Sequence, residues 1–179
     1  LWWSTRTDDV LMGYPTVDRA ALARLAADPV ARRTVTLMVD DVAHLDLIAE
    51  ATATARSKSG DDMPPIRVCL DIDASLRVGP FHLGVRRSPL RTPEDAVTLA
   101  RQATRRGIEV RGVMFYEAQV AGLPDTSPAI RLVKRASLAE LLHRRGAVVS
   151  ALEGALGRPM LVNGGGTGSI AATALDTTV

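Results

Sequence analysis

Short apolar runs rich in β-branched residues alternate with Ala-rich stretches along the chain. Five of these runs predict strands, over residues 10–14, 35–39, 66–73, 110–116 and 160–162. Successive positions in each run are apolar, which is typical of parallel strands covered on both faces. The alternation therefore predicts repeated βα units around a parallel sheet.

Helix signals lie between the predicted strands. Thr92 precedes Pro93 and two acidic residues. This combination of cap, first-turn proline and favourable dipole charge predicts a helix that runs to about Arg106 and ends at Gly107. Three further helices are predicted, from Asp18 through Ala27, from Asp40 or Asp41 through Arg56, and from Ser127-Pro128 to near Gly157 with a candidate break at 144–146.

A glycine-rich run, Asn163-Gly164-Gly165-Gly166-Thr167-Gly168-Ser169, follows the last predicted strand. Glycines allow close approach of the backbone to a ligand, and successive N–H groups at a helix start converge on an anion, with hydroxyl donors added by the Thr and Ser. The run has neither the dinucleotide fingerprint nor the Gly-Lys-Ser/Thr ending of a nucleotide P-loop. It predicts a phosphate-binding loop, and the alternative is a flexible connector.

Two architectures fit these elements, an open doubly wound sheet and a closed (β/α)₈ barrel. In the open dinucleotide-binding sheet the phosphate loop follows the first strand, whereas barrels bind phosphate on late βα loops, as here. The predicted fold class is therefore α/β, a partial (β/α)₈ TIM-type barrel. Five strands do not close such a barrel, so we expect residues 1–179 to be a fragment that lacks the first and last strands.

Polar residues lie at or just after the carboxyl ends of the predicted strands, where barrels carry functional groups. They are Tyr14, Asp40, Asp71, Asp73, Tyr116 and Glu117. Tyr116 is a candidate platform for a flat cofactor ring, and the alternative is a ring that closes the core. For Asp40 the alternative to a functional role is capping of the next helix. For Asp73 the alternative is that its side chain fixes the backbone of its own loop.

The long loop over residues 74–91 contains His82 and the pair Arg86-Arg87. Loops of this length are usually functional. The arginines have the chemistry to pair with a carboxylate or a phosphate, and the alternative is that solvent surrounds them. His82 with Asp71, Asp73 and Glu117 makes a conceivable metal site, but no spacing is diagnostic and no metal is predicted.

Length, charge and cysteine content exclude several classes of protein. A chain of 179 residues with a formal charge of +2 and dispersed arginines fits one domain that does not bind nucleic acid. Cys69 lies in an apolar run and offers no disulfide framework, which fits a reducing, cytoplasmic setting. No apolar stretch of about 20 residues and no signal peptide is visible, so no membrane association is predicted.

Four segments together resemble the D-threonine aldolase-like proteins. They are Asp-Asp-Val-Leu-Met-Gly-Tyr-Pro at 8–15, Leu-Asp-Ile-Asp at 70–73, Val-Met-Phe-Tyr-Glu-Ala-Gln at 113–119 and the glycine run at 163–169. Residues 84–89 and 116–125 resemble, more narrowly, the amino acid deaminase/aldolase branch of the alanine racemase N-terminal-domain superfamily, the pyridoxal-phosphate (PLP) fold type III. The resemblance covers nearly the whole chain.

This resemblance implies a PLP enzyme with its cofactor at the mouth of a (β/α)₈ barrel, a second, mainly β domain downstream, and a homodimeric assembly. It assigns phosphate contacts to Gly165, Gly166, Thr167, Gly168 and Ser169, and the ring-facing position to Tyr116. His82 is implied near the cofactor, because His82-Leu83-Gly84-Val85 stands where relatives carry a Gly-Met-Gly-Arg-Thr-Gly-Val type of sequence.

The chain also departs from the family pattern. The lysine that forms the Schiff base lies at the end of the family's first barrel strand, whereas Lys58 and Lys134 fall in predicted helical stretches. The catalytic lysine is therefore expected before Leu1, and residues 1–179 alone are expected to be inactive. Gln119 stands where a His is common, so the reaction cannot be copied from the best-known aldolases.

The resemblance predicts a PLP-dependent lyase acting on a D-amino acid, such as D-threonine or D-serine, when the protein is intact. The cofactor serves as electron sink for a Cα carbanion. Cleavage of Cα–Cβ is aldolase chemistry, and loss of a β-hydroxyl is dehydratase and deaminase chemistry. The alternatives are a non-catalytic PLP-binding or homeostasis protein, an alanine racemase-like racemase, and a barrel enzyme that binds a phosphorylated metabolite.

Overall fold

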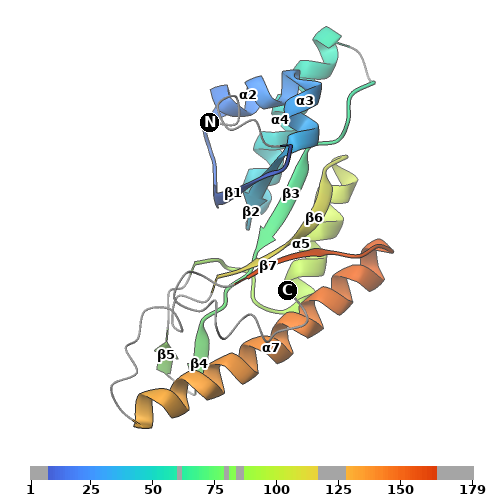
Figure 1. The fold of residues 1–179 in the computed structure, drawn as a ribbon. Helices are drawn as coiled ribbons and strands as arrows, with labels where there is room; N and C mark the ends of the chain where they lie inside the picture. The colour runs from blue at the N-terminus through green and yellow to red at the C-terminus, as the bar shows by residue number, and fades with distance from the viewer. Residues whose placement is uncertain (1–7, 60–61, 79–80, 84–86, 117–127, 165–179) are drawn as a thin grey trace. The chain divides into compact units, whose positions relative to one another are not determined.

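The computed structural model describes residues 8–59, 62–78, 81–83, 87–116 and 128–164, with side chains left out at 58–59, 76–78, 81–83 and 128–138. Figure 1 shows strands alternating with helices along the chain. The strands are β1 (Val10–Pro15), β2 (Val35–Val39), β3 (Arg67–Asp71), β4 (Leu76–Val78), β5 (Phe81–Leu83), β6 (Glu109–Phe115) and β7 (Leu161–Gly164). The helices are α2 (Arg19–Ala27), α3 (Pro29–Thr34), α4 (Val42–Ser59), α5 (Pro93–Arg105) and α7 (Pro128–Leu156).

Five strands form one sheet in the order β1-β2-β3-β6-β7, and β4 pairs with β5 in a separate antiparallel hairpin. The pairs β1–β2, β2–β3 and β6–β7 are parallel. Parallel neighbours joined through helices are the repeated βα units that the hydrophobic pattern predicts. The chain divides into two compact units, Leu1–Leu70 with Thr98–Arg111, and Asp71–Val97 with Gly112–Val179.

The first unit contains the most completely buried strands. All five residues of β2 are buried, and so are four of the five in β3, including Cys69. The prediction of strands covered on both faces is therefore confirmed for β2 and β3. It is wrong for β1 and β7, which end the strand order and keep exposed positions such as Tyr14 and Leu161.

Helix starts follow the predicted caps. Asp18 accepts a hydrogen bond from the Ala21 N–H at the start of α2, and Asp41 accepts one from the Ala43 N–H at the start of α4. The helix α5 ends before Gly107, whose φ of +70° lies in the left-handed region that glycine adopts without strain.

Three local predictions are wrong. The helix α7 continues without a break through 144–146, because Arg144 and Arg145 are held by partners in the protein instead of ending the helix. The helix α3, which Asp28 caps at Pro29, is missing from the predicted set, although Asp-Pro is a start signal. The loop over 74–91 contains the hairpin β4–β5.

In the second unit, the backbones of β6 and β7 come very close to each other at Gly112. A Cβ at this position would overlap the carbonyl oxygen of Leu161 on the neighbouring strand. No side chain fits there, so β6 and β7 pack at this point only because residue 112 is glycine.

A reciprocal cap starts α5. The Asp95 carboxylate accepts the Thr92 N–H at 2.9 Å, and the Asp95 N–H donates to the Thr92 hydroxyl at 3.2 Å. The Thr92 N–H is the main cause that lowers the pKa of the Asp95 carboxyl, with smaller help from the Arg91 N–H and the Thr92 hydroxyl and opposition from burial. The capping carboxylate is therefore more stable charged in the folded chain.

We expect Asp95→Ala to lower the free energy of unfolding by about 0.5–2 kcal/mol at neutral pH, because the cap is lost. The folded pKa is below the unfolded one, so this stabilisation is present above the unfolded pKa and disappears as the pH falls through the folded pKa. Urea unfolding of both proteins across the acid range measures the difference. Glu94→Ala, an exposed acid in the same turn, is the control, and a pH-independent Asp95→Ala penalty would contradict the assignment.

Candidate functional site

The carboxyl ends of three strands meet at one edge of the second unit. Phe115 at the end of β6 is in register with Gly164 at the end of β7. The Ile72 N–H, one residue beyond β3, donates to the Met114 carbonyl at 2.9 Å. The residues that follow these strands, Asp73, Tyr116 and the glycine run, therefore start from one edge of the sheet.

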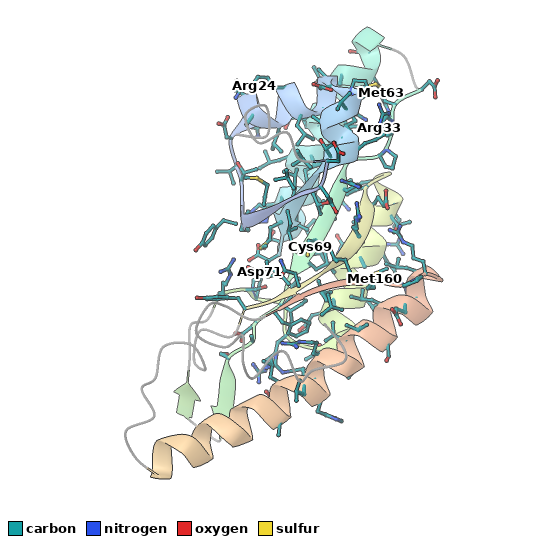
Figure 2. All side chains as sticks on the ribbon, viewed as in Figure 1. Arg24, Arg33, Met63, Cys69, Asp71 and Met160 are labelled. Carbon is teal, nitrogen blue, oxygen red and sulfur yellow. The ribbon has the colours of Figure 1, made fainter. Side chains whose placement is uncertain are left out.

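Asp71 is the last residue of β3, and Figure 2 labels its side chain. Its carboxylate is 1% exposed and accepts a hydrogen bond from Arg87 Nε at 2.9 Å. The Arg87 guanidinium carbon also lies 5.2 Å from the centroid of the Tyr116 ring. The buried carboxylate thus holds a cation against the aromatic ring, and a flat ligand stacking on Tyr116 would have to use the other ring face.

Asp73 organises the loop that follows β3. Its carboxylate is fully buried and accepts the Ser75 N–H at 3.1 Å, the Ser75 hydroxyl at 2.9 Å and the Arg91 guanidinium at 3.3 Å. Arg144 on α7 donates to the backbone carbonyls of Asp73 and Ser75, and Glu140 accepts from Arg144 at 2.8 Å. The geometry therefore gives Asp73 the role of fixing its loop backbone.

Arg145 lies next to the first glycine of the run. Its side chain is completely buried on α7, and its guanidinium carbon is 5.5 Å from the centroid of the Phe115 ring. A Cβ added at Gly164 would stand 3.0 Å from Arg145 Nη2 and 3.4 Å from the Phe115 carbonyl oxygen. A buried guanidinium therefore lies beside Gly164, the residue at which the glycine run begins.

The predicted site residues differ in what the structure describes of them. Tyr116 lies at the end of β6 with 37% of its surface exposed, next to Arg87. His82 lies on β5, directly opposite Arg77 in the hairpin register. Gly165, Gly166, Thr167, Gly168, Ser169, Arg86, Glu117 and Gln119 lie outside the described residues. Their assignments remain predictions.

Two other polar residues from the predicted strand ends belong to the first unit. The Asp40 carboxylate is 3.1 Å from His44 Nδ1, four residues later, while the cap at the start of α4 comes from Asp41. Tyr14 is 72% exposed. Among the residues that the structure describes, no three ligating side chains gather in a way that would hold a metal ion.

Sequence reasoning missed the buried arginines of α7, although a signal was present. Leu141, Arg145, Val148 and Leu152 are spaced by four, three and four residues and are all fully buried. This spacing marks one face of a helix. An arginine on the apolar face of a helix is a buried charge and needs polar partners. The pair at 144–145 therefore indicates polar groups packed against this face of α7 and not the end of the helix.

Structural comparison supplies the relatives. The chain matches D-threonine aldolase from Filomicrobium marinum with a TM-score of 0.71 and 23% identity, over 95% of this chain and 40% of that one. It matches D-threo-3-hydroxyaspartate dehydratase from Delftia sp. HT23 with a TM-score of 0.62 and 22% identity, over 99% of this chain and 42% of that one. No family model and no curated protein matches the sequence.

These likenesses establish the fold. The prediction of a partial (β/α)₈ barrel is confirmed, and so is the resemblance to D-threonine aldolase-like proteins at the level of the fold. The chain spans about two-fifths of the length of each of these structures. No helix in the described ranges combines the length and the apolar composition needed to cross a bilayer.

We expect Gly164→Ala to lower the free energy of unfolding by about 1–3 kcal/mol, because Arg145 is buried against Phe115 and cannot yield space cheaply. Urea denaturation measures the loss. Gly154→Ala is the matched control, since residue 154 is exposed on α7 with open space around it and should gain about 0.5–1 kcal/mol. Equal effects of the two substitutions would contradict the close approach of Arg145.

Proposed function

We propose that this chain is the cofactor-binding part of a PLP-dependent lyase that acts on D-amino acids. The observation that carries the proposal is that Gly164, the last residue of β7 and the first glycine of the run, lies beside the buried Arg145 in a chain with the fold of D-threonine aldolase. Fold alone does not determine activity. The proposal therefore depends on what the residues at this edge of the sheet are suited to hold.

The edge fits the phosphate end of PLP. Gly164 leaves no room for a side chain beside Arg145, so the backbone of the run starts next to a buried guanidinium. Backbone N–H groups and two hydroxyls in the next five residues are the donors that phosphate oxygens accept from. Arg145 adds positive potential to this cradle without being exposed to solvent.

The edge also fits the ring end. Tyr116 offers an aromatic face at the end of β6, and the Asp71–Arg87 pair holds that ring from one side. Both partners of this pair are largely buried, so the Arg87 guanidinium is held over one face of the Tyr116 ring. In the proposed enzyme, Tyr116 therefore positions the cofactor ring, while Asp71 and Arg87 position Tyr116.

When bound, PLP withdraws electrons from the substrate Cα. The chain's own residues anchor the phosphate through Gly165 to Ser169, orient the ring through Tyr116, and keep the loop after β3 rigid through Asp73, Arg91 and Arg144. We place the lysine that tethers the cofactor outside residues 1–179, since Lys58 and Lys134 lie on α4 and α7 and not at a strand end.

The substrate class proposed is a D-β-hydroxy amino acid, and the two solved relatives act on compounds of this kind by their names. Aldol cleavage of D-threonine would give glycine and acetaldehyde. Dehydration would give 2-oxobutanoate and ammonia. A product assay on the purified full-length protein with D-threonine and D-serine separates these reactions. Inversion at Cα, which would give L-serine from D-serine and L-allothreonine from D-threonine, would indicate a racemase, and no turnover of any kind would indicate a carrier.

We expect the purified full-length protein to show a visible absorption band of bound PLP that borohydride abolishes. Peptide mapping after reduction should locate the cofactor on a lysine other than Lys58 or Lys134. A reduced cofactor on either of these two, or a protein that never retains PLP, would contradict the proposal.

Gly166→Asp should abolish PLP retention, because it places a side chain and a negative charge in the phosphate cradle. Fluorescence titration with PLP measures the affinity. Gly154→Asp makes the same chemical change at an exposed position of α7 and should leave PLP affinity unchanged. Unchanged affinity in the Gly166→Asp protein would remove the glycine run from the binding site.

A further inference from the structure

A second group of arginines lies in the first unit, at the amino ends of β3 and β6. There a pocket of about 340 Å³ is lined by Arg32, Arg33, Arg67, Glu109 and Arg111 together with Pro64 and Pro65. Arg67 and Glu109 are the first residues of their strands, and Arg33, labelled in Figure 2, lies near the end of α3. We call this feature the basic pocket. It is separate in the chain from the glycine run, which follows the carboxyl end of β7.

Arg32 is the fixed element of the basic pocket. Its side chain is completely buried, with Nε donating to the Ala26 carbonyl at 2.7 Å and Nη1 donating to the Pro64 carbonyl at 2.9 Å. Its Nη2 is also buried and has no hydrogen-bond acceptor among the described residues. Buried N–H groups of a cation almost always donate a hydrogen bond. An acceptor on a bound ligand would give this nitrogen such a bond.

Arg67 repeats the pattern. Its Nε is buried and likewise has no acceptor in the described part of the chain. Its Nη2 lies 3.5 Å from one carboxylate oxygen of Asp9, and Arg111 Nη2 lies 3.4 Å from the other. Because the Asp9 side chain is 60% exposed, these long ion pairs are weak. These two contacts of Asp9 are therefore screened by solvent.

Charge is unbalanced at the basic pocket. Among the described residues, the pocket lining contains four arginines and one carboxylate, that of Glu109, and Asp9 pairs with Arg67 and Arg111. Burial lowers the pKa of Arg32, and the Arg56 guanidinium adds to the shift. Burial also lowers the pKa of Arg67, as does Arg111, while Asp9 and Glu109 act in the opposite direction. Crowding of like charges is a cost that a bound anion would remove.

We propose that the basic pocket binds a small oxyanion of the phosphate class. The planar guanidinium fork matches the oxygens of phosphate, and Arg32 is held in place before any ligand arrives. The volume is at the low end of small-ligand sites, which run from about 300 Å³. Free phosphate and the phosphoryl group of a small metabolite share this chemistry.

The test is isothermal titration of the purified full-length protein with inorganic phosphate, at constant ionic strength with chloride as the other anion. Arg111→Gln should weaken phosphate binding by about tenfold or more, because a charge-assisted contact is lost. Arg101→Gln removes an equally charged but exposed side chain of α5 and should change affinity by less than about twofold. Arg32 is avoided, since the loss of a buried arginine would confuse unfolding with lost binding.

A gain of affinity makes the test sharper. Asp9→Asn removes the negative charge of an exposed carboxylate that competes with phosphate. It should tighten phosphate binding by about two- to fivefold, which corresponds to the free energy of an exposed ion pair. Equal affinities of the Arg111→Gln and Arg101→Gln proteins would overturn the proposal. So would an Asp9→Asn protein that binds no more tightly, or phosphate that binds no better than chloride.

Two further arms locate the site and its ligand. The losses and gains above should persist in the Gly166→Asp protein, whose glycine run is blocked, and their disappearance there would assign the phosphate to the run and overturn the proposal. Glycerol phosphate binding more tightly than inorganic phosphate would support a phosphorylated metabolite as the ligand, and weaker binding would support the free ion. These outcomes do not depend on whether the protein is a PLP enzyme.

Discussion

The second unit depends on two buried guanidinium groups at adjacent positions of α7. Arg144 ties the helix to the carbonyls of Asp73 and Ser75, and Arg145 packs against Phe115 beside Gly164. A buried charge is costly unless its hydrogen-bonding groups are used. The helix, the loop after β3 and the end of β7 are therefore held together by polar contacts at the edge where the proposed cofactor site lies.

The contrast between the two neighbouring arginines explains how one helix serves two purposes. Arg144 has Glu140 one turn earlier and backbone carbonyls beyond it, so its charge is neutralised within the protein. Arg145 points its guanidinium towards the start of the glycine run. Adjacent residues of a helix point about 100° apart. A shift of α7 by one residue would therefore remove both arginines from their present contacts.

Much of the fold could be predicted because it depends on local signals. Thr92, Pro93 and Gly107 mark α5 by side-chain hydrogen bonding, fixed φ and a left-handed φ, and each acts within a few residues. The hydrophobic runs located all five strands of the main sheet within two residues at each end. The hairpin β4–β5 was not predicted, because each of its strands has only three residues, too few for their alternation of apolar and polar residues to stand out within a long loop.

The candidate site was harder to predict, because its contacts join residues far apart in the chain. Tyr116 and Asp71 could be selected from their places at strand ends. The pairing of Asp71 with Arg87, and of Asp73 with Arg91 and Arg144, required the fold. Arg144 and Arg145 were misread as a helix break, since charge next to glycine is a local stop signal and burial of that charge is a property of the tertiary structure.

Gly112 has a consequence for how the chain tolerates changes in length. Since only glycine can face the Leu161 carbonyl, sliding β7 along β6 by one position would bring a larger residue of β6 against that oxygen. The register of β7 relative to β6 is therefore fixed. Insertions or deletions between α7 and β7 must be absorbed in the connecting turn, so that β7 always ends at the same level of the sheet.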